Sequence, residues 1–346
     1  MNRQTLVAAA LTALAVARVS GQDAPPAATD TAYVAGEYRV FTGAGEPATL
    51  EDVVAAMGNH DVVFVGETHD DPTGHMLEAE LLTRAWQTWG GGAAADAAAR
   101  TVALSLEFFQ RDVQPIVDEY LAGLITESAF RADSRPWPRY ETDYRPLVEF
   151  AKEHGLDVIA ANAPRRYTTR VTMHGRESLD GLSPHARESL PPLPYGQPSK
   201  EYRDQWIEVI SEVMEQEGMK CGVPVANPAA HVGAHDNMGN QLHSQVLWDA
   251  SMGWWIAQYL QSHPDALVLH MVGGFHVARG TGTPEHLAAY RPGTRAMIVM
   301  LRPVTDVDTF EPAPDGEWGD FVIQTDAART LEAIECRAFT AEHEVR

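Results

Sequence analysis

Four short, continuous apolar runs, separated by segments of helical periodicity, constrain the fold of this chain most strongly. Helical patterns occupy 74–89, 112–122 and 144–154, and we expect two further strands at 296–303 and 320–325. A run that is apolar throughout, rather than alternating, suits a strand buried on both faces of a sheet. The pattern therefore predicts an α/β fold with a largely parallel central sheet and helices on both faces. The four runs are DVVFVG (61–66), TVALSLE (101–107), LDVIAAN (156–162) and ALVLHMVGG (266–274).

One long segment interrupts this alternation between the third and fourth runs. Residues 166–262 begin with a stretch rich in proline and glycine and continue with two aromatic-rich helical patterns, around 201–217 and 241–263. We interpret this segment as a smaller helical insertion, or lid. The α/β body then comprises 38–165 and 263–346.

The N-terminal residues have the pattern of a secretory signal peptide. Residues 1–21 hold an early arginine, an apolar core too short to span a bilayer, and small residues before Gln22. Residues 22–37 are rich in proline and alanine and predict a linker. The alternative is an uncleaved membrane anchor. No cysteine follows the apolar core, so no lipid-attachment residue is present, and we expect an exported protein, periplasmic or secreted.

The charge balance limits the class of partner. The formal net charge is −22, and a surface this acidic repels phosphate backbones, so nucleic acid is not expected as a partner. We expect no transmembrane segment in the mature chain. Cys221 and Cys336 are the two cysteines, and the sequence leaves open whether they pair.

Polar residues follow each of the four apolar runs where the predicted strand ends. In a parallel sheet the carboxyl ends of the strands lie along one edge, where such folds bind ligands. Glycines at two of these ends would allow sharp turns and close approach of a ligand. We therefore predict a pocket at this edge. Its residues are Gly66, Glu67, His69 and His75 at and beyond the end of the first run, Glu107 at the end of the second, Asn162 and Arg165 at and beyond the end of the third, and Gly273 and His276 at and beyond the end of the fourth.

The spacing G-x-x-H occurs twice in this set, at Gly66–His69 and Gly273–His276. Two imidazoles with Glu67 and Glu107 suit a divalent metal such as Zn, Mn or Fe, and a carboxylate that is not a ligand can act as a general base. We expect His75 to lie outside the ligand set and to orient one of the metal-binding side chains. The alternative is structural, with Glu67 capping the next helix and the histidines bonded to the backbone.

The insertion holds a second set of candidate ligands. Histidine, methionine and tyrosine are axial ligands of haem iron, and aromatic side chains suit the flat faces of the macrocycle. The alternative is that the loop histidines are solvated and that the aromatic stripe is core. The candidate haem ligands are His231, His235, Met238, His243, Tyr195 and Tyr202.

Several ordered motifs resemble the ChaN-like haem-binding uptake family, which is related to the Tiki and TraB proteins. The resemblance covers most of the mature chain, residues 22–346. It rests on VGETHDDPTGHMLEAELL, LSLEFFQRDVQPIVDEYLAG, WPRYETDYRPLVEFAKEHGLDVIAANAPRRYTTRV, QVLWDASMGWWI and GGFHVARGTGTPEHL.

The resemblance implies an exported protein that binds haem, or another iron porphyrin, and serves iron acquisition. Relatives of the Tiki branch are metal-dependent proteases with paired G-x-x-H motifs and a glutamate, which places Glu67, His69, Glu107 and His276 in a metal site. The chain lacks the lipid-bearing cysteine of lipoprotein members. A planar ligand can be held between two protomers, so a homodimer is compatible with haem binding.

Two functions are therefore predicted. The first is haem binding outside the cytoplasm. The alternative is a metal-dependent hydrolase, a peptidase or esterase, in which Glu67 and Glu107 are catalytic.

Overall fold

The described strands form one eight-stranded sheet in the order β2-β1-β8-β7-β3-β6-β4-β5. The computed structural model describes residues 38–91, 99–217 and 238–331, which belong to one compact unit. Neighbours from β8 to β5 are parallel, whereas β1 is antiparallel to β2 and β8. The strands are β1 Tyr38–Thr42, β2 Pro47–Ala48, β3 Val62–Glu67, β4 Val102–Gln110, β5 Asp157–Asn162, β6 Leu267–Gly273, β7 Ala296–Val304 and β8 Phe321–Asp326.

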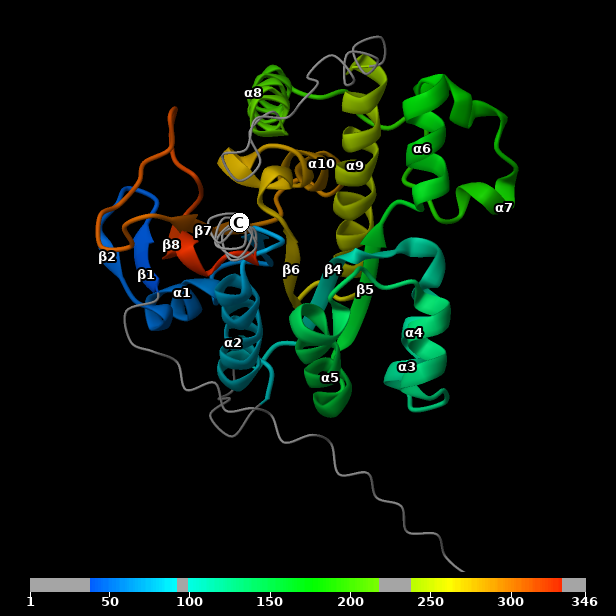
Figure 1. Cartoon of the computed structure of the whole chain (residues 1–346). Helices are drawn as coiled ribbons and strands as arrows, with labels where there is room; N and C mark the ends of the chain where they lie inside the picture. The colour runs from blue at the N-terminus through cyan, green and yellow to red at the C-terminus, as the bar shows by residue number, and fades with distance from the viewer. Residues whose placement is uncertain (1–37, 92–98, 218–237, 332–346) are drawn as a thin grey trace, which may run out of the picture. The chain divides into compact units, whose positions relative to one another are not determined.

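Helices lie on both faces of this sheet, as predicted (Figure 1). Alternate residues of β3 point to opposite faces: Val63 and Val65 pack with α1, α2, α3 and α5, whereas Val62 and Phe64 pack with α9 and α10. The helices are α1 Leu50–Met57, α2 Pro72–Trp89, α3 Gln114–Leu121, α4 Glu127–Ser134, α5 Arg145–His154, α6 Arg165–His174, α7 Pro184–Arg187, α8 Lys200–Glu217, α9 Met238–Ser262 and α10 Thr283–Tyr290.

The strand order explains how distant segments reach one place. β6 lies between β3 and β4, and β5 pairs with the other side of β4. The four strands predicted from the apolar runs are thus consecutive neighbours in the sheet, although α6 to α9 intervene between β5 and β6 in the chain. The turn after β6 therefore lies between the ends of β3 and β4.

Helix α2 begins where the first polar turn ends. Asp71 is the N-cap: its side chain accepts a hydrogen bond from the Thr73 backbone N–H, and Pro72 occupies the first helical position. This fixes the path from Glu67 into α2 and keeps Glu67 out of the capping role that was the structural alternative. Asp71 also accepts a hydrogen bond from the Thr325 hydroxyl on β8 at 2.6 Å, which joins the helix start to the sheet.

The helical segment of 166–262 has a core of its own. Side chains of α6, α8 and α9 pack together around Tyr195, Tyr202 and Trp206, and α9 also packs on the sheet. Its role as an insertion or lid stays a prediction. The expected signal peptide and linker, Cys221 and Cys336 lie outside the described residues. Among the helices of the described residues, none is long and apolar enough to span a membrane.

Candidate functional site

A pocket of about 780 Å³ lies at the carboxyl edge of β3, β4, β5 and β6. It contains most of the site residues predicted from the strand ends, and aromatic side chains from the loop before α5, from α8 and α9 and from the turn after β6 form its walls. The predicted residues that line it are Glu67, His69, Glu107, Asn162, Arg165, Gly273 and His276, and the aromatic ones are Trp137, Trp206, Trp248 and Phe275.

The first polar pair joins Glu67 and His69. His69 Nδ1 lies 2.7 Å from Glu67 Oε1, and the imidazole side chain is half exposed while the carboxylate is buried. Burial raises the pKa of Glu67, but hydrogen bonds from His69 and His75 outweigh it and lower that pKa to about 2. Glu67 is therefore a buried anion that holds the His69 ring in a fixed orientation.

The second pair joins Glu107 and His276. The Gly273 backbone N–H donates to Glu107 Oε2 at 2.7 Å, and His276 Nε2 lies 3.6 Å from Glu107 Oε1. The other ring nitrogen of His276, Nδ1, lies 2.8 Å from Asp249 Oδ1. Burial lowers the pKa of His276, yet the Asp249 and Glu107 carboxylates outweigh it and raise that pKa to about 9. Two His–carboxylate pairs thus flank the turn after β6.

Both predicted glycines lie where a side chain would collide. A Cβ atom at Gly273 would lie 2.9 Å from His69 Cε1 and 3.4 Å from Glu107 Oε2. A Cβ atom at Gly66 would lie 2.7 Å from the Met300 sulfur. Glycine at 273 is what allows the two polar pairs to approach each other.

Asn162 and Arg165 lie at the pocket for different reasons. Asn162 is buried, and its side-chain oxygen accepts a hydrogen bond from the Ala163 N–H at 2.8 Å, which shapes the turn after β5. The Arg165 N–H donates to the Gln110 side chain at 2.9 Å, which ties the start of α6 to the end of β4. Arg165 contributes a cationic side chain to the pocket lining.

His75 lies behind Glu67 and not in the pocket wall. Its Nδ1 is 2.9 Å from Glu67 Oε2 and 3.1 Å from Glu78 Oε2. Burial lowers the pKa of His75, but the two carboxylates raise it to about 11. Burial, together with the Glu67 charge, raises the pKa of Glu78 to about 8. The Tyr144 hydroxyl donates to Glu67 Oε1 at 3.0 Å, so Glu67 connects the pocket to a buried polar cluster.

The predicted metal ligands lie in one pocket, but not around one point. All four side chains are described, and no three of them bring their ligand atoms within 4.8 Å of one another. Among the described residues, that criterion is met by Glu67, His75 and Glu78.

The candidate haem ligands of the helical segment do not line this pocket where they are described. Tyr195 is buried and donates its hydroxyl to the His243 carbonyl at 2.8 Å, and Tyr202 is buried and donates to Asp249 Oδ2 at 2.5 Å. His243 is half-buried, and burial lowers its pKa. His231, His235 and the side chain of Met238 lie outside the described residues.

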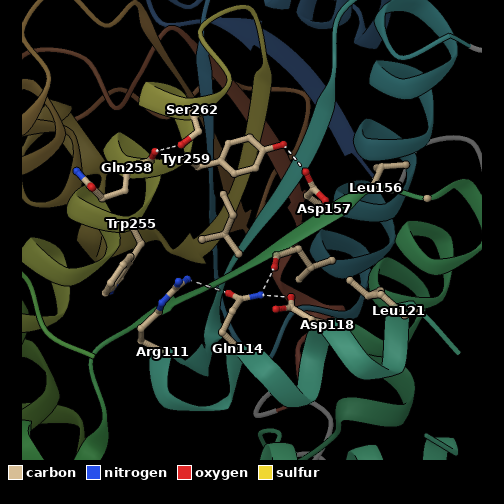
Figure 2. A pocket seen from close by; sticks show the side chains of 14 residues that line it. Arg111, Gln114, Asp118, Leu121, Leu156, Asp157, Trp255, Gln258, Tyr259 and Ser262 are labelled. Carbon is tan, nitrogen blue, oxygen red and sulfur yellow. Dashed lines mark hydrogen bonds between the residues drawn. The ribbon is translucent and has the colours of Figure 1, made fainter. Parts of the chain in front are cut away.

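A second cavity, of about 590 Å³, lies beside the start of β5 (Figure 2). Its polar groups bind one another: Gln114 donates to Asp118 and to the Val158 carbonyl, both at 2.7 Å, and Tyr259 donates to Asp157 at 2.8 Å. The Arg111 guanidinium lies over the ring of Trp255, 3.8 Å from its centroid. No His–carboxylate pair lines this cavity among the described residues, so we place the candidate site at the carboxyl ends of the strands.

Sequence reasoning missed three residues that support the site: Asp249 on α9, Glu78 on α2 and Tyr144. A signal existed for two of them. Asp249 is the one charged residue in the otherwise uncharged stretch QVLWDASMGWWI, and Glu78 follows His75 by three positions, which places both on one helix face. Asp249 is fully buried, and it also accepts a hydrogen bond from the Thr283 hydroxyl at 2.8 Å.

Known proteins that are similar to this chain include a solved structure and a plant protein. The structure titled "Cofacial heme binding to ChaN of Campylobacter jejuni" has a TM-score of 0.58 and 16% sequence identity, covering 84% of this chain and 97% of that chain. It shares the fold. Protein RETICULATA-RELATED 5, chloroplastic, of Arabidopsis thaliana is 24% identical over 256 residues, which cover 71% of this chain. This chain spans 31% of the length of that relative.

A family model supplies the assignment. The model described as haem-binding uptake, Tiki superfamily, ChaN matches residues 53–287, which is more than half of the chain and runs from α1 into α10. The match includes every strand that ends at the pocket. The chain therefore belongs to the ChaN family of the Tiki superfamily.

Proposed function

We propose that this protein is an exported haem-binding protein that serves haem or iron uptake, and that it holds haem in the sheet-edge pocket. Membership in the family described as haem-binding uptake supports the ligand, and so does the fold shared with ChaN of Campylobacter jejuni, which is described as binding haem cofacially. Localisation in the periplasm or outside the cell rests on the pattern of residues 1–21.

The arrangement of His69 carries the proposal. Its imidazole is half exposed at the pocket, its Nδ1 is bonded to the buried Glu67, and no hydrogen bond reaches its Nε2 from the described residues. A histidine held through one ring nitrogen by a carboxylate presents the other nitrogen to a metal with increased basicity. His69 therefore fits the role of an axial ligand to haem iron.

The walls of the pocket fit a flat apolar ligand with acidic groups. Trp137 packs edge-on against His69, with ring centroids 5.0 Å apart, and Trp206, Trp248 and Phe275 extend the aromatic lining. Arg165 adds positive charge in a protein of net charge −22. Haem offers two aromatic faces and two propionates, so the aromatic lining and the guanidinium match separate parts of it.

A haemin titration tests this function. We expect the purified protein to give a saturable change in the Soret band, and His69→Ala to bind haemin at least about tenfold more weakly. His185→Ala is the matched control, because His185 is an exposed histidine on α7 that does not line the pocket. Equal affinity of the wild type and His69→Ala would refute the pocket assignment.

The metal-dependent hydrolase stays a prediction. Its four ligands do not surround one point in this structure, and the family description favours haem. Ester hydrolysis by the wild type would support the hydrolase function if a chelator abolishes this activity and the Glu107→Gln variant lacks it.

A further inference from the structure

A second cluster of ligand-type atoms lies beneath the floor of the proposed haem pocket, and the haem proposal uses only one of its residues, Glu67. It consists of Glu67, His75 and Glu78, whose ligand atoms all lie within 4.8 Å of one another. His75 and Glu78 belong to α2 and Glu67 ends β3. The three residues are 5% exposed or less, so the polar atoms must be satisfied by one another or by something bound among them.

Hydrogen bonding fixes the tautomer of a neutral His75. Its Nε2 lies 3.1 Å from the His69 carbonyl oxygen, and a carbonyl can only accept. Nε2 therefore carries the proton, and Nδ1 of the neutral ring presents its lone pair. That lone pair faces Glu67 Oε2 at 2.9 Å and Glu78 Oε2 at 3.1 Å. Two carboxyl oxygens and one ring nitrogen, all of them atoms that can bind a metal, therefore converge.

Protonation of the ring does not resolve this convergence. One Nδ1–H donates fully to a single acceptor, whereas two buried carboxylates face it. Glu67 Oε2 and Glu78 Oε1 are buried and, apart from the 2.9 Å approach of His75 Nδ1 to Glu67 Oε2, have no hydrogen-bond partner within the described structure. Tyr144 and His69 both donate to the other oxygen of Glu67, Oε1, and so do not reach Oε2. A buried acceptor atom without a donor costs about 1 to 3 kcal/mol.

We propose that Glu67, His75 and Glu78 bind one divalent transition-metal ion in this buried position. Two carboxylates and a neutral imidazole balance the 2+ charge, and such an N/O set suits Zn²⁺, Mn²⁺ or Fe²⁺. The bond from Nε2–H to a backbone carbonyl is the usual outer-shell partner of a histidine ligand. On the far side of the ring, Asp143 Oδ2 lies 3.6 Å from Nε2 and pairs with Arg139 at 2.7 Å.

This site differs from the metal site predicted from the strand ends. It shares Glu67 with the pocket, but it uses neither G-x-x-H imidazole. Because Glu67 also holds His69, an ion on Glu67 Oε2 would fix the carboxylate that orients the candidate haem ligand. The proposal does not depend on haem binding, since residues of β3 and α2 alone bring the three ligand atoms together.

Metal analysis of the purified protein tests the proposal. The protein is stripped with a chelator during unfolding, refolded with Zn²⁺ or Mn²⁺, freed of excess metal, and its metal content is measured by mass spectrometry. We expect one ion per chain. Glu78→Gln keeps the shape of the side chain but removes its charge, and we expect its affinity for the ion to fall at least about tenfold. Glu80→Gln is the matched control, because Glu80 lies on the same helix with an exposed side chain.

A His69→Ala, His276→Ala double variant separates the two metal sites. It should keep one ion per chain, because it removes both pocket imidazoles and leaves the triad intact. Loss of the ion in this variant, with retention in Glu78→Gln, would overturn the proposal in favour of the strand-end ligands. A refolded wild type without stoichiometric metal would also overturn it, whether or not any variant folds.

Discussion

Asp249→Asn should destabilise the protein in a way that depends on pH through His276. The substitution keeps the size of the side chain but removes the buried negative charge that lies 2.8 Å from His276 Nδ1. Although burial lowers the pKa of His276, Asp249 and then Glu107 raise it to about 9. The ordinary pKa of histidine is about 6.5, so the folded state binds this proton more tightly than the unfolded state does.

The magnitude follows from that difference in pKa. At about 1.4 kcal/mol for each pKa unit, the proton on His276 contributes about 3 kcal/mol to the free energy of unfolding. Because the folded pKa is the higher one, this contribution is complete below about pH 6.5 and is lost as the pH rises through about 9. Asp249 is the larger of the two raising charges, so we expect Asp249→Asn to be less stable than the wild type by about 2 to 3 kcal/mol near pH 6. The difference should shrink to less than about 1 kcal/mol near pH 10.

Urea unfolding followed by circular dichroism at both pH values measures this difference. His276→Gln is the control, because it removes the titrating ring and should lose the same pH dependence. A stability difference between the wild type and Asp249→Asn that is equal at the two pH values would refute the electrostatic coupling of Asp249 to His276.

Two further predictions concern the start of α2 and the turn after β6. Asp71→Ala removes the N-cap of α2 and the hydrogen bond to Thr325. We expect urea unfolding to show a free energy of unfolding lower by about 1 to 3 kcal/mol. Unchanged stability would show that the Asp71 side chain does not stabilise the start of α2. Gly273→Ala places a methyl group against His69 and Glu107. We expect this variant to bind haemin at least about tenfold more weakly and its free energy of unfolding to fall by about 1 to 3 kcal/mol. Haemin affinity equal to that of the wild type would show that this turn does not shape the site.

Much of the sheet could be predicted from local sequence. The buried parallel strands are continuous apolar runs, and each of the six predicted strands is present within a few residues of its expected bounds. β1 (YRVFT) and the two-residue β2 were missed, because neither is a continuous apolar run and both lie at the antiparallel end of the sheet. The position of β6 between β3 and β4 could not be predicted, since strand order depends on packing between distant segments.

The sequence predicts those site residues whose positions are determined by the carboxyl ends of the parallel strands. Glu67 and Glu107 lie near the carboxyl ends of β3 and β4, and His276 follows β6. Because the carboxyl ends of these parallel strands meet, the fold class alone brings the three residues together. Asp249 and Glu78 approach from α9 and α2, and whether a helical acid faces solvent or a buried histidine depends on how the helix is rotated against the sheet. Their roles became visible only through the contacts of His276 and His75.

Chemical rescue of a His69→Gly variant tests the central claim, that His69 holds haem iron in the sheet-edge pocket, most directly. The variant leaves Glu67 in place but empties the space of the ring, which free imidazole can enter. We predict that His69→Gly with haemin lacks the wild-type Soret spectrum and that added imidazole restores it. A wild-type spectrum without imidazole would contradict the claim, because it would place the iron on another ligand.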